Sequence, residues 1–425
     1  MKKVLATVAV STALILGGAV AASAAGIEVD GVVRIRGINI DTTIGTDKAA
    51  KNYYDQKVQV GFKSKPSDNL TGYIRLGSAS TSTDNFNWDD GPATKAGSEM
   101  YIDEAWIDYK PTSFGLKAGR MHLNLPGNNF IDHRSDAPDS GILVYGDLAG
   151  TKVGLLTVKL SEGSALDDNS SDLDAYIVHL GRKFSDNFSG DVAYTLLKGG
   201  ADDESSYFNG LAMSDLGLNA TVKAGGLTVK GDVNLQFGTY SDNGTTAVDA
   251  NGYAVQLNAD YKIGKSTIGA MLAQGSGDDN SADNDNDTFL AYLFSTYRHN
   301  TLAGYALATP GSGKIGSGNT GLSNLTIMQL NASTSVTCPI TGKPLSLFGA
   351  LNFLQTTEDV TAANGAKTDD LGTELHAKAA WKLTSNLTYL VEGFYVMTDD
   401  AYTHGKSSMD IDDIYWLRHG ITMKF

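Results

Sequence analysis

Apolar and polar residues alternate one by one along much of the chain after residue 26. In the range 70–76, Leu70, Ile74 and Leu76 share one face of an extended strand, while Tyr73 and Arg75 share the other. Successive side chains of a β-strand point to opposite faces, so a period of two predicts strands whose two faces meet different environments. The same alternation recurs in 371–381 and 413–425. The pattern predicts an all-β chain.

Short and long connections separate these segments in turn. Tight reversals rich in Gly, Pro, Asp, Asn, Ser and Thr are expected at 65–72, 111–115, 149–151, 184–190, 224–226, 263–266, 338–344 and 383–389. Such residues favour turns because they hydrogen-bond to their own backbone or tolerate positive φ. Long polar stretches alternate with them, at 41–52, 81–98, 124–141, 162–171, 199–207, 240–250, 276–321, 355–370 and 398–412.

Eight turns and nine loops predict about 18 antiparallel strands, an even number as bacterial barrels require. The range is roughly 16 to 20. The segments 289–294 and 302–307 could form one more hairpin, and two doubtful strands elsewhere could merge. The expected fold is a transmembrane antiparallel β-barrel with short periplasmic turns and long extracellular loops. A soluble β-sandwich would also alternate, so the pattern alone leaves both open.

The first 25 residues have the composition of a secretory signal. Lys2 and Lys3 precede an apolar stretch, 4–20, and the small residues 22–25 follow it. This predicts a signal peptide at 1–25 and a single barrel domain at 26–425. A retained membrane helix is disfavoured because the apolar core is short. No later apolar run is long enough for a spanning helix, and in hydrocarbon only helices and closed barrels satisfy the backbone.

Charge and cysteine content exclude several classes of protein. The chain has 33 Lys and Arg against 48 Asp and Glu, a net charge of −15. Without Lys2 and Lys3 it becomes 31 − 48 = −17. An acidic chain without basic clusters is not expected to bind nucleic acid. The single cysteine, Cys338, excludes a disulfide scaffold.

No motif of an enzyme, cofactor or metal site is evident. The seven histidines are scattered, and HExxH, GxSxG, P-loop and dinucleotide fingerprints are absent. The acidic run 283–287 begins like a calcium loop, but Thr288 stands where Gly is needed and Phe294 where the closing Glu would be. We therefore expect no enzyme, cofactor or metal. A hydrolase built from strand-borne Ser and His stays open.

The chain ends in Phe425, and apolar residues occupy alternate positions before it, including Met423 and Ile421. This resembles the C-terminal recognition strand of Gram-negative outer-membrane barrels, from which His419 departs as a polar residue. The resemblance implies that Phe425, Met423 and Ile421 form the barrel-insertion signal. It also implies three partners, namely the insertion machinery, outer-membrane lipid and lipopolysaccharide.

Three short segments carry a finer resemblance. Residues 118–122, followed by a loop rich in Pro, Asn and Asp, resemble the junction between a strand and the third loop in porins. Residues 297–304 with 322–325, and residues 371–387, are similar to parts of alginate-export-type porins, which are 18-stranded barrels. The chain also resembles the abundant porins of metal-reducing proteobacteria. This implies a porin in the cell outer membrane with an in-folded third loop at about 124–141, and it allows a homotrimer.

Charges on the inner face would set the selectivity of such a pore. The hypothesis is a constriction in which carboxylates of the third loop face a basic wall made by Arg34, Arg36, Arg75 and Arg120. The alternative is that the arginines pair with lumen carboxylates such as Glu104 and stabilise the wall. The candidate pore-lining residues are Arg34, Arg36, Arg75, Glu104, Asp108, Arg120, His122, Asp132, Arg134 and Asp136.

Passive diffusion of small hydrophilic solutes and ions through a water-filled channel is the function that the sequence favours. One alternative is a barrel that sheathes a partner multihaem cytochrome for electron transfer across the outer membrane. Another is an adhesin or structural protein with a plugged lumen. Ion conductance by the pure protein would favour the pore, and co-purified haem would favour the sheath.

Overall fold

The computed structural model describes residues 26–41, 50–79, 86–87, 99–122, 139–161, 172–200, 210–242, 247–280, 282–292, 300–304, 307–315, 320–406 and 411–425. Eighteen long strands dominate it. They are β1 (Ile27–Asp41), β2 (Lys51–Ser67), β3 (Leu70–Ala79), β5 (Glu99–Tyr109), β6 (Phe114–Met121), β7 (Asp139–Leu148), β8 (Thr151–Ser161), β9 (Leu173–Ser185), β10 (Phe188–Gly199), β11 (Ala212–Ala224), β12 (Leu227–Asp242), β14 (Tyr253–Ile263), β15 (Ser266–Gly275), β17 (Leu325–Thr337), β18 (Pro344–Thr361), β19 (Lys367–Lys382), β20 (Leu387–Thr398) and β21 (Ile414–Lys424). The connections hold the short elements β4 (Phe86–Asn87), β13 (Ala247–Ala250), β16 (Asp285–Asn286) and the 3₁₀ helix η2 (Asp400–Thr403).

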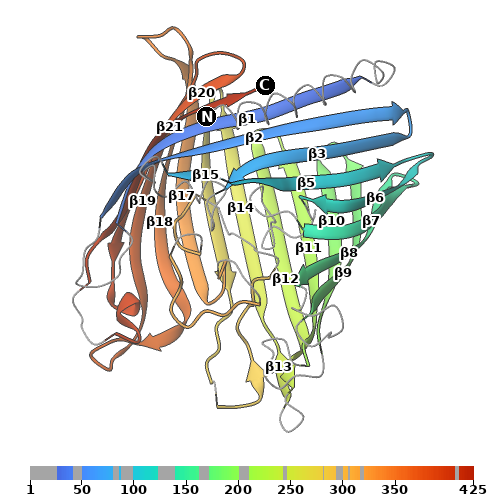
Figure 1. Cartoon of the computed structure of the whole chain (residues 1–425). Helices are drawn as coiled ribbons and strands as arrows, with labels where there is room; N and C mark the ends of the chain where they lie inside the picture. Colours follow the sequence, from blue (N-terminus) through green and yellow to red (C-terminus); the bar gives the residue numbers. More distant parts are fainter. Residues whose placement is uncertain are drawn as a thin grey trace.

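Each long strand pairs antiparallel with the next, and the last strand pairs with the first. In β1 and β21 the register runs from Val32 opposite Lys424 to Asp41 opposite Tyr415. Beyond it, the Gly31 N–H donates to the Phe425 carbonyl oxygen at 2.9 Å, and the Phe425 N–H donates back at 3.1 Å. In Figure 1 the blue β1 and β2 accordingly lie beside the red β21. The sheet is a closed ring, which leaves no strand edge unpaired.

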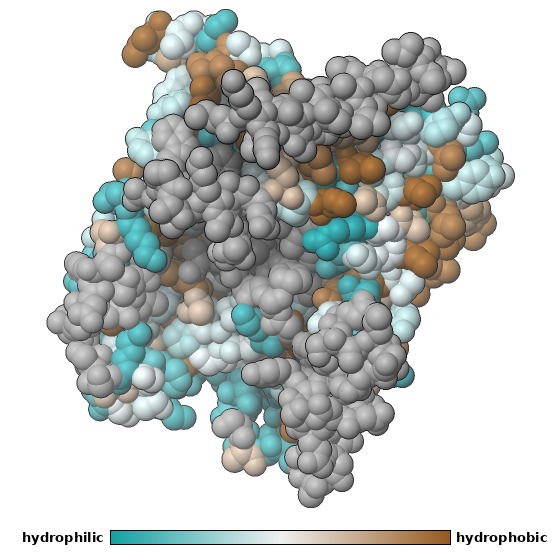
Figure 2. All heavy atoms as spheres, viewed as in Figure 1, coloured by the Kyte–Doolittle hydropathy of each residue, from teal (hydrophilic) through white to brown (hydrophobic). Residues whose placement is uncertain are grey.

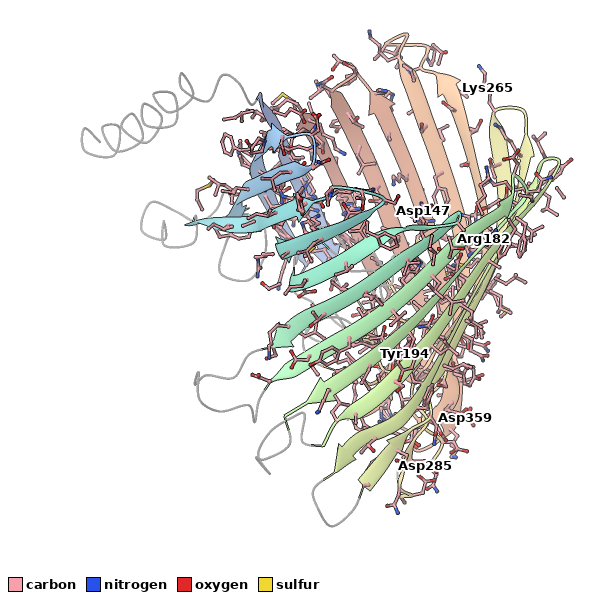
Figure 3. The ribbon with its side chains drawn as sticks, turned by 90° about the vertical axis from the view of Figure 1, so that its right-hand side faces the viewer. Asp147, Arg182, Tyr194, Lys265, Asp285 and Asp359 are labelled. Atoms are coloured by element: carbon pink, nitrogen blue, oxygen red, sulfur yellow. The ribbon has the colours of Figure 1, made fainter. Side chains whose placement is uncertain are left out.

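Eight connections of two to six residues join strands at one end of the barrel, the turn end, and the longer connections lie at the other, the loop end. Figure 3 shows Asp147 and Lys265, beside two of the turns, far from Asp285 and Asp359 at the loop end. In the 149–150 turn Ala149 and Gly150 have φ of 50° and 79°, as tight hairpins require. The predicted turns are confirmed. The predicted loop at 355–370 is too long, because β18 and β19 continue to Thr361 and Lys367.

Apolar side chains cover the outside of the ring and polar ones lie within it. Leu257 and Leu330, on the outer faces of β14 and β17, are 53% and 57% exposed, whereas the inward Asp215, Asn352 and Glu374 are fully buried. Figure 2 shows apolar residues gathered on the flank where β6 to β9 lie. A soluble β-sandwich would bury its apolar faces instead. The distribution therefore favours the membrane barrel over the sandwich.

Within the described residues, no helix is both long and apolar enough to cross a membrane.

The additional hairpin considered for 289–294 and 302–307 does not form in the described parts of these segments. Only two isolated bridges occur there, Ala291 with Lys314 and Ala303 with Leu307. The strand number is therefore 18 and not 20.

Candidate functional site: the lumen wall and the in-folded segment

A band of charged side chains crosses the inner faces of the first strands. Arg36 on β1 lies opposite Asp55 on β2, and its Nε donates to Asp55 Oδ1 at 2.8 Å while Nη2 contacts Oδ2. Two pairs along the register, Arg34 lies opposite Lys57, and the alternation of β2 gives Lys57 and Asp55 the same inward face. Arg34 and Arg36 thus share the lumen side.

The next strands continue the band through a β-bulge. Between Arg75 opposite Glu104 and Leu76 opposite Ile102 the register shifts by one residue, so Asp103 has no directly opposed partner on β3. Asp103 and Glu104 consequently both point inward, although they are adjacent in sequence. Arg75 binds both, with Nη2 2.9 Å from Glu104 Oε1 and Nε against Asp103, which also accepts from Gln59 Nε2 at 2.7 Å.

Arg75→Ala would leave two buried carboxylates without their guanidinium. Removing one partner of a buried ion pair typically costs about 3–5 kcal/mol. We therefore expect the variant to unfold at a clearly lower temperature, measured by the gel shift between folded and heat-denatured protein. Lys65→Ala is the control, since its pair with Glu28 is exposed. Equal unfolding temperatures for wild type and Arg75→Ala would contradict the proposed role of this cluster.

Arg120 does not share the inner face with His122, contrary to the sequence-based prediction. It lies opposite Ala105 and Ser140 and is exposed, on the same face of β6 as the outward Leu116. His122 follows the end of β6 and turns inward, where its Nε2 contacts Arg75 Nη2. Arg120 is therefore removed from the proposed basic wall. Alternation assigns an inward or outward face only to residues within a strand. Because β6 ends one residue before His122, the face of His122 says nothing about that of Arg120.

Asp108 lies inward at the turn end, as the alternation predicts. The Tyr145 hydroxyl donates to its carboxylate, 2.8 and 2.9 Å from the two oxygens. Trp106, on the same face of β5, packs against Tyr73 with the two rings tilted, and Lys117 Nζ lies 3.8 Å from the centre of a Trp106 ring. Trp106 is thus a lumen residue, although its position near a strand end is also typical of an outer aromatic girdle.

Charged residues on β19 to β21 extend the band on the other side of β1, and sequence reasoning did not select them. Glu392 lies 3.1 Å from His376 Nε2 and accepts from Arg418 Nε at 2.5 Å. Lys378, Glu392 and Arg418 occupy directly opposed positions in the register. The signal was present, since all are inward positions of alternating strands. The sequence pattern does not show that β21 pairs with β1. This pairing brings Arg418 near Arg36.

Two described stretches of the long connection between β15 and β17 fold into the lumen. Gln236, an inward residue of β12, donates to the Leu290 carbonyl oxygen at 2.9 Å and accepts from the Leu290 N–H at 2.8 Å. On β19, Glu374 accepts from the Leu302 N–H at 2.8 Å and from the Thr301 hydroxyl at 3.3 Å. We call the described residues 288–292 and 300–304 the in-folded segment.

Apolar packing accompanies these hydrogen bonds. Phe289, Leu290, Tyr292 and Leu302 are each 0–1% exposed, in the same buried cluster as Leu325 at the start of β17. These four large apolar residues in a polar loop need a surface to cover them, and that composition was the signal for in-folding. The segment narrows the space within the barrel on the side of β12 to β19.

The third loop cannot be compared with its prediction. Asp132, Arg134 and Asp136 lie outside the described residues. Asp139, expected in that loop, begins β7 and is buried. The proposed opposition of loop carboxylates and basic wall stays a prediction. The described contacts favour the alternative for Arg36 and Arg75, which pair with wall carboxylates, Glu104 among them.

Two groups of side chains in the described residues have the spacing of metal ligands. Asp103, Glu104 and His122 place ligand atoms within 4.8 Å of one another, but Arg75 already contacts all three. The second group, Asp278, Asp279 and Asp287, lies at the loop end.

Comparisons with known proteins support the fold. No protein-family model matches the chain, and no curated protein sequence does. Solved structures of Pseudomonas aeruginosa outer-membrane porins do match. OccK5 (OpdH) superposes with a TM-score of 0.59 at 13% identity, covering 94% of this chain and 98% of that one. The chain has a porin fold. OpdK, crystallised with vanillate, gives 0.59 at 14% identity, and OccK7 (OpdD) 0.57 at 12%, with the same coverage of both chains.

Proposed function

We propose that this protein is an outer-membrane porin that lets small hydrophilic solutes and ions diffuse passively through a water-filled lumen. One observation carries the proposal: a closed ring of strands has an apolar outside and a charged inside. A pore wall must replace part of the hydration of a passing solute, and charged and polar side chains do so. The matching porin structures support it, since OccK5 (OpdH) superposes over 94% of this 18-stranded chain.

The charged band favours polar and ionic solutes over apolar ones. Arg36, Arg75 and Arg418 each pair with a carboxylate of the wall, so positive and negative groups lie side by side along it. A solute that carries both a charge and hydroxyl or carboxyl groups can exchange water for these partners. Vanillate, bound in one structural neighbour, is a reasonable member of the test set.

The direct test is the conductance of the purified protein in a planar bilayer, together with swelling of liposomes in sugars and organic anions of graded size. The porin proposal expects discrete current steps and a size limit for swelling. A folded, inserted protein that passes neither ions nor sugars would contradict it. Haem that co-purifies in a fixed ratio would favour the cytochrome sheath. The in-folded segment argues against that sheath, because it occupies lumen space that a cytochrome would need.

Arg34→Ala and Arg120→Ala form a matched pair for the role of the wall. Arg34 is on the lumen face and Arg120 is on the outer face. Arg34→Ala is expected to shift the reversal potential toward cation selectivity, because a positive charge leaves the permeation path. Arg120→Ala is expected to leave it unchanged. A shift in Arg120→Ala alone would overturn this assignment of faces.

A further inference from the structure

The two ends of the barrel carry charge of opposite sign. At the turn end, six exposed lysines occupy inward positions of six strands, each an even number of residues from a buried inward side chain. Lys230, for instance, is two residues from Asp232 on β12, and Lys262 is six from Gln256 on β14. The six are Lys152, Lys223, Lys230, Lys262, Lys382 and Lys424. The ladders around them have no register shift next to the turns.

Within the described residues, none of these six lysines has an ion pair, whereas Lys63 and Lys183 at the same end are paired with Glu28 and Asp186. The six ammonium groups thus ring the mouth of the barrel at the turn end. Positive charge around a narrow opening in a low-dielectric wall raises the local concentration of anions.

The loop end is crowded with carboxylates. The described parts of 276–324, 355–370 and 398–413 contain thirteen Asp and Glu against three Lys. Asp278, Asp279 and Asp287 lie so close that their oxygens are within 4.8 Å of one another. Burial and the neighbouring carboxylates of Asp278 and Asp285 raise the pKa of Asp287 above its usual value. Figure 3 shows Asp285 and Asp359 at this end, opposite Lys265.

We propose that the pore is an ionic rectifier, in which the acidic loop end and the lysine ring at the turn end make current flow more easily in one direction than in the other. The proposal rests on the porin function above. The proposal gives the six lysines at the turn end, the lysine ring, a role in permeation that is separate from that of the charged band.

The direction in which the current is larger follows from the signs of the charge at the two ends. Cations are enriched at the acidic end and anions at the lysine ring. When the loop side is positive, the field drives both kinds of ion from the mouths where they are enriched toward the middle of the pore. The number of carriers inside rises, and so does the current. With the opposite polarity both kinds of ion leave the middle and the current falls. Salt screens both mouths, so the asymmetry must decline as ionic strength rises.

The test is a current–voltage curve of single channels of known orientation. A Lys265→Cys variant in a Cys338→Ser background is tagged with thiol-reactive biotin, and streptavidin added to one chamber marks the turn side. At 10 mM salt, where the screening length is about 30 Å, the current with the loop side positive is expected to exceed its reverse by about 1.5-fold or more. At 1 M salt, where that length is about 3 Å, the ratio is expected to approach 1.

A variant with all six lysines changed to Gln is expected to lose most of the asymmetry and still conduct. Single substitutions supply the matched control: Lys230→Gln lowers the ratio, and Arg182→Gln does not, because Arg182 is on the outer face of β9 beside Phe184. Equal currents in both directions at 10 mM salt, or a larger current with the turn side positive, would overturn the proposal. A channel that passes no current at all would instead refute the porin function.

Discussion

Cutting the anchors of the in-folded segment is expected to raise the single-channel conductance roughly twofold or more, because the segment then leaves the permeation path. The double variant Gln236→Ala, Glu374→Ala removes the two anchors of Leu290 and Leu302, and it leaves the bond from Asn352 Nδ2 to the Asn300 carbonyl oxygen. Gln236 holds both backbone groups of Leu290, and Glu374 holds the Leu302 N–H and the Thr301 hydroxyl. Each substitution leaves buried polar groups without a hydrogen-bond partner, which lowers the stability of the in-folded segment by about 1–3 kcal/mol per group. The barrel strands keep their own ladders.

Single-channel recording in a planar bilayer gives the result, with Asn219→Ala as control. Asn219 is also an inward polar residue, but it binds Asp232 on the neighbouring strand and not the segment. Glu374→Gln keeps an acceptor oxygen and should retain most of the wild-type conductance. If the double variant folds and still conducts like the wild type, Gln236 and Glu374 do not hold the segment in the permeation path.

Deleting residues 421–425 is expected to abolish nearly all folded protein in the outer membrane. These residues form half of the seam that closes the barrel: Ile421 and Met423 lie opposite Ile35 and Val33, and Phe425 exchanges two backbone hydrogen bonds with Gly31. Without them the turn-end half of β1 presents unpaired backbone groups to lipid, at several kcal/mol per group. The resemblance to insertion signals predicts a further loss at the step of recognition.

The assay is the amount of heat-modifiable protein in isolated outer membranes. Phe425→Trp keeps a terminal aromatic side chain and the backbone pairing, so it should assemble close to wild-type levels. Phe425→Ala separates the two effects, since it keeps the backbone bonds and removes the ring. Normal amounts of folded protein after the deletion would show that neither the seam nor the signal matters.

Local chemistry made much of the fold predictable from the sequence. Turn residues act on their own backbone, so the eight reversals could be placed without any knowledge of contacts. The period of two in 413–425 correctly separates the outward Leu417 and Met423 from the inward Arg418. The strand number followed from these two signals alone.

Other features of the wall depend on contacts that local pattern does not encode. The bulge at Asp103 turns two consecutive residues inward and so breaks the alternation. Arg120 was misplaced because His122, which does face inward, lies beyond the strand end. The in-folded segment depends on Gln236 and Glu374, which are 54 and 72 residues away from Leu290 and Leu302. Separations of that size are set by tertiary structure.

Thiol accessibility in a lipid bilayer tests most directly that the barrel is wet inside and lipid-covered outside. Hydrogen bonds from Thr341 lower the pKa of the buried Cys338 thiol to about 7, and Cys338→Ser removes this native thiol from the background. A charged, membrane-impermeant thiol reagent is expected to label Arg34→Cys and Asn219→Cys, on the lumen faces of β1 and β11, and to leave Leu257→Cys and Leu330→Cys unmodified. Equal labelling of all four positions, or labelling of only the leucine positions, would contradict a lipid-facing outside and a water-filled lumen.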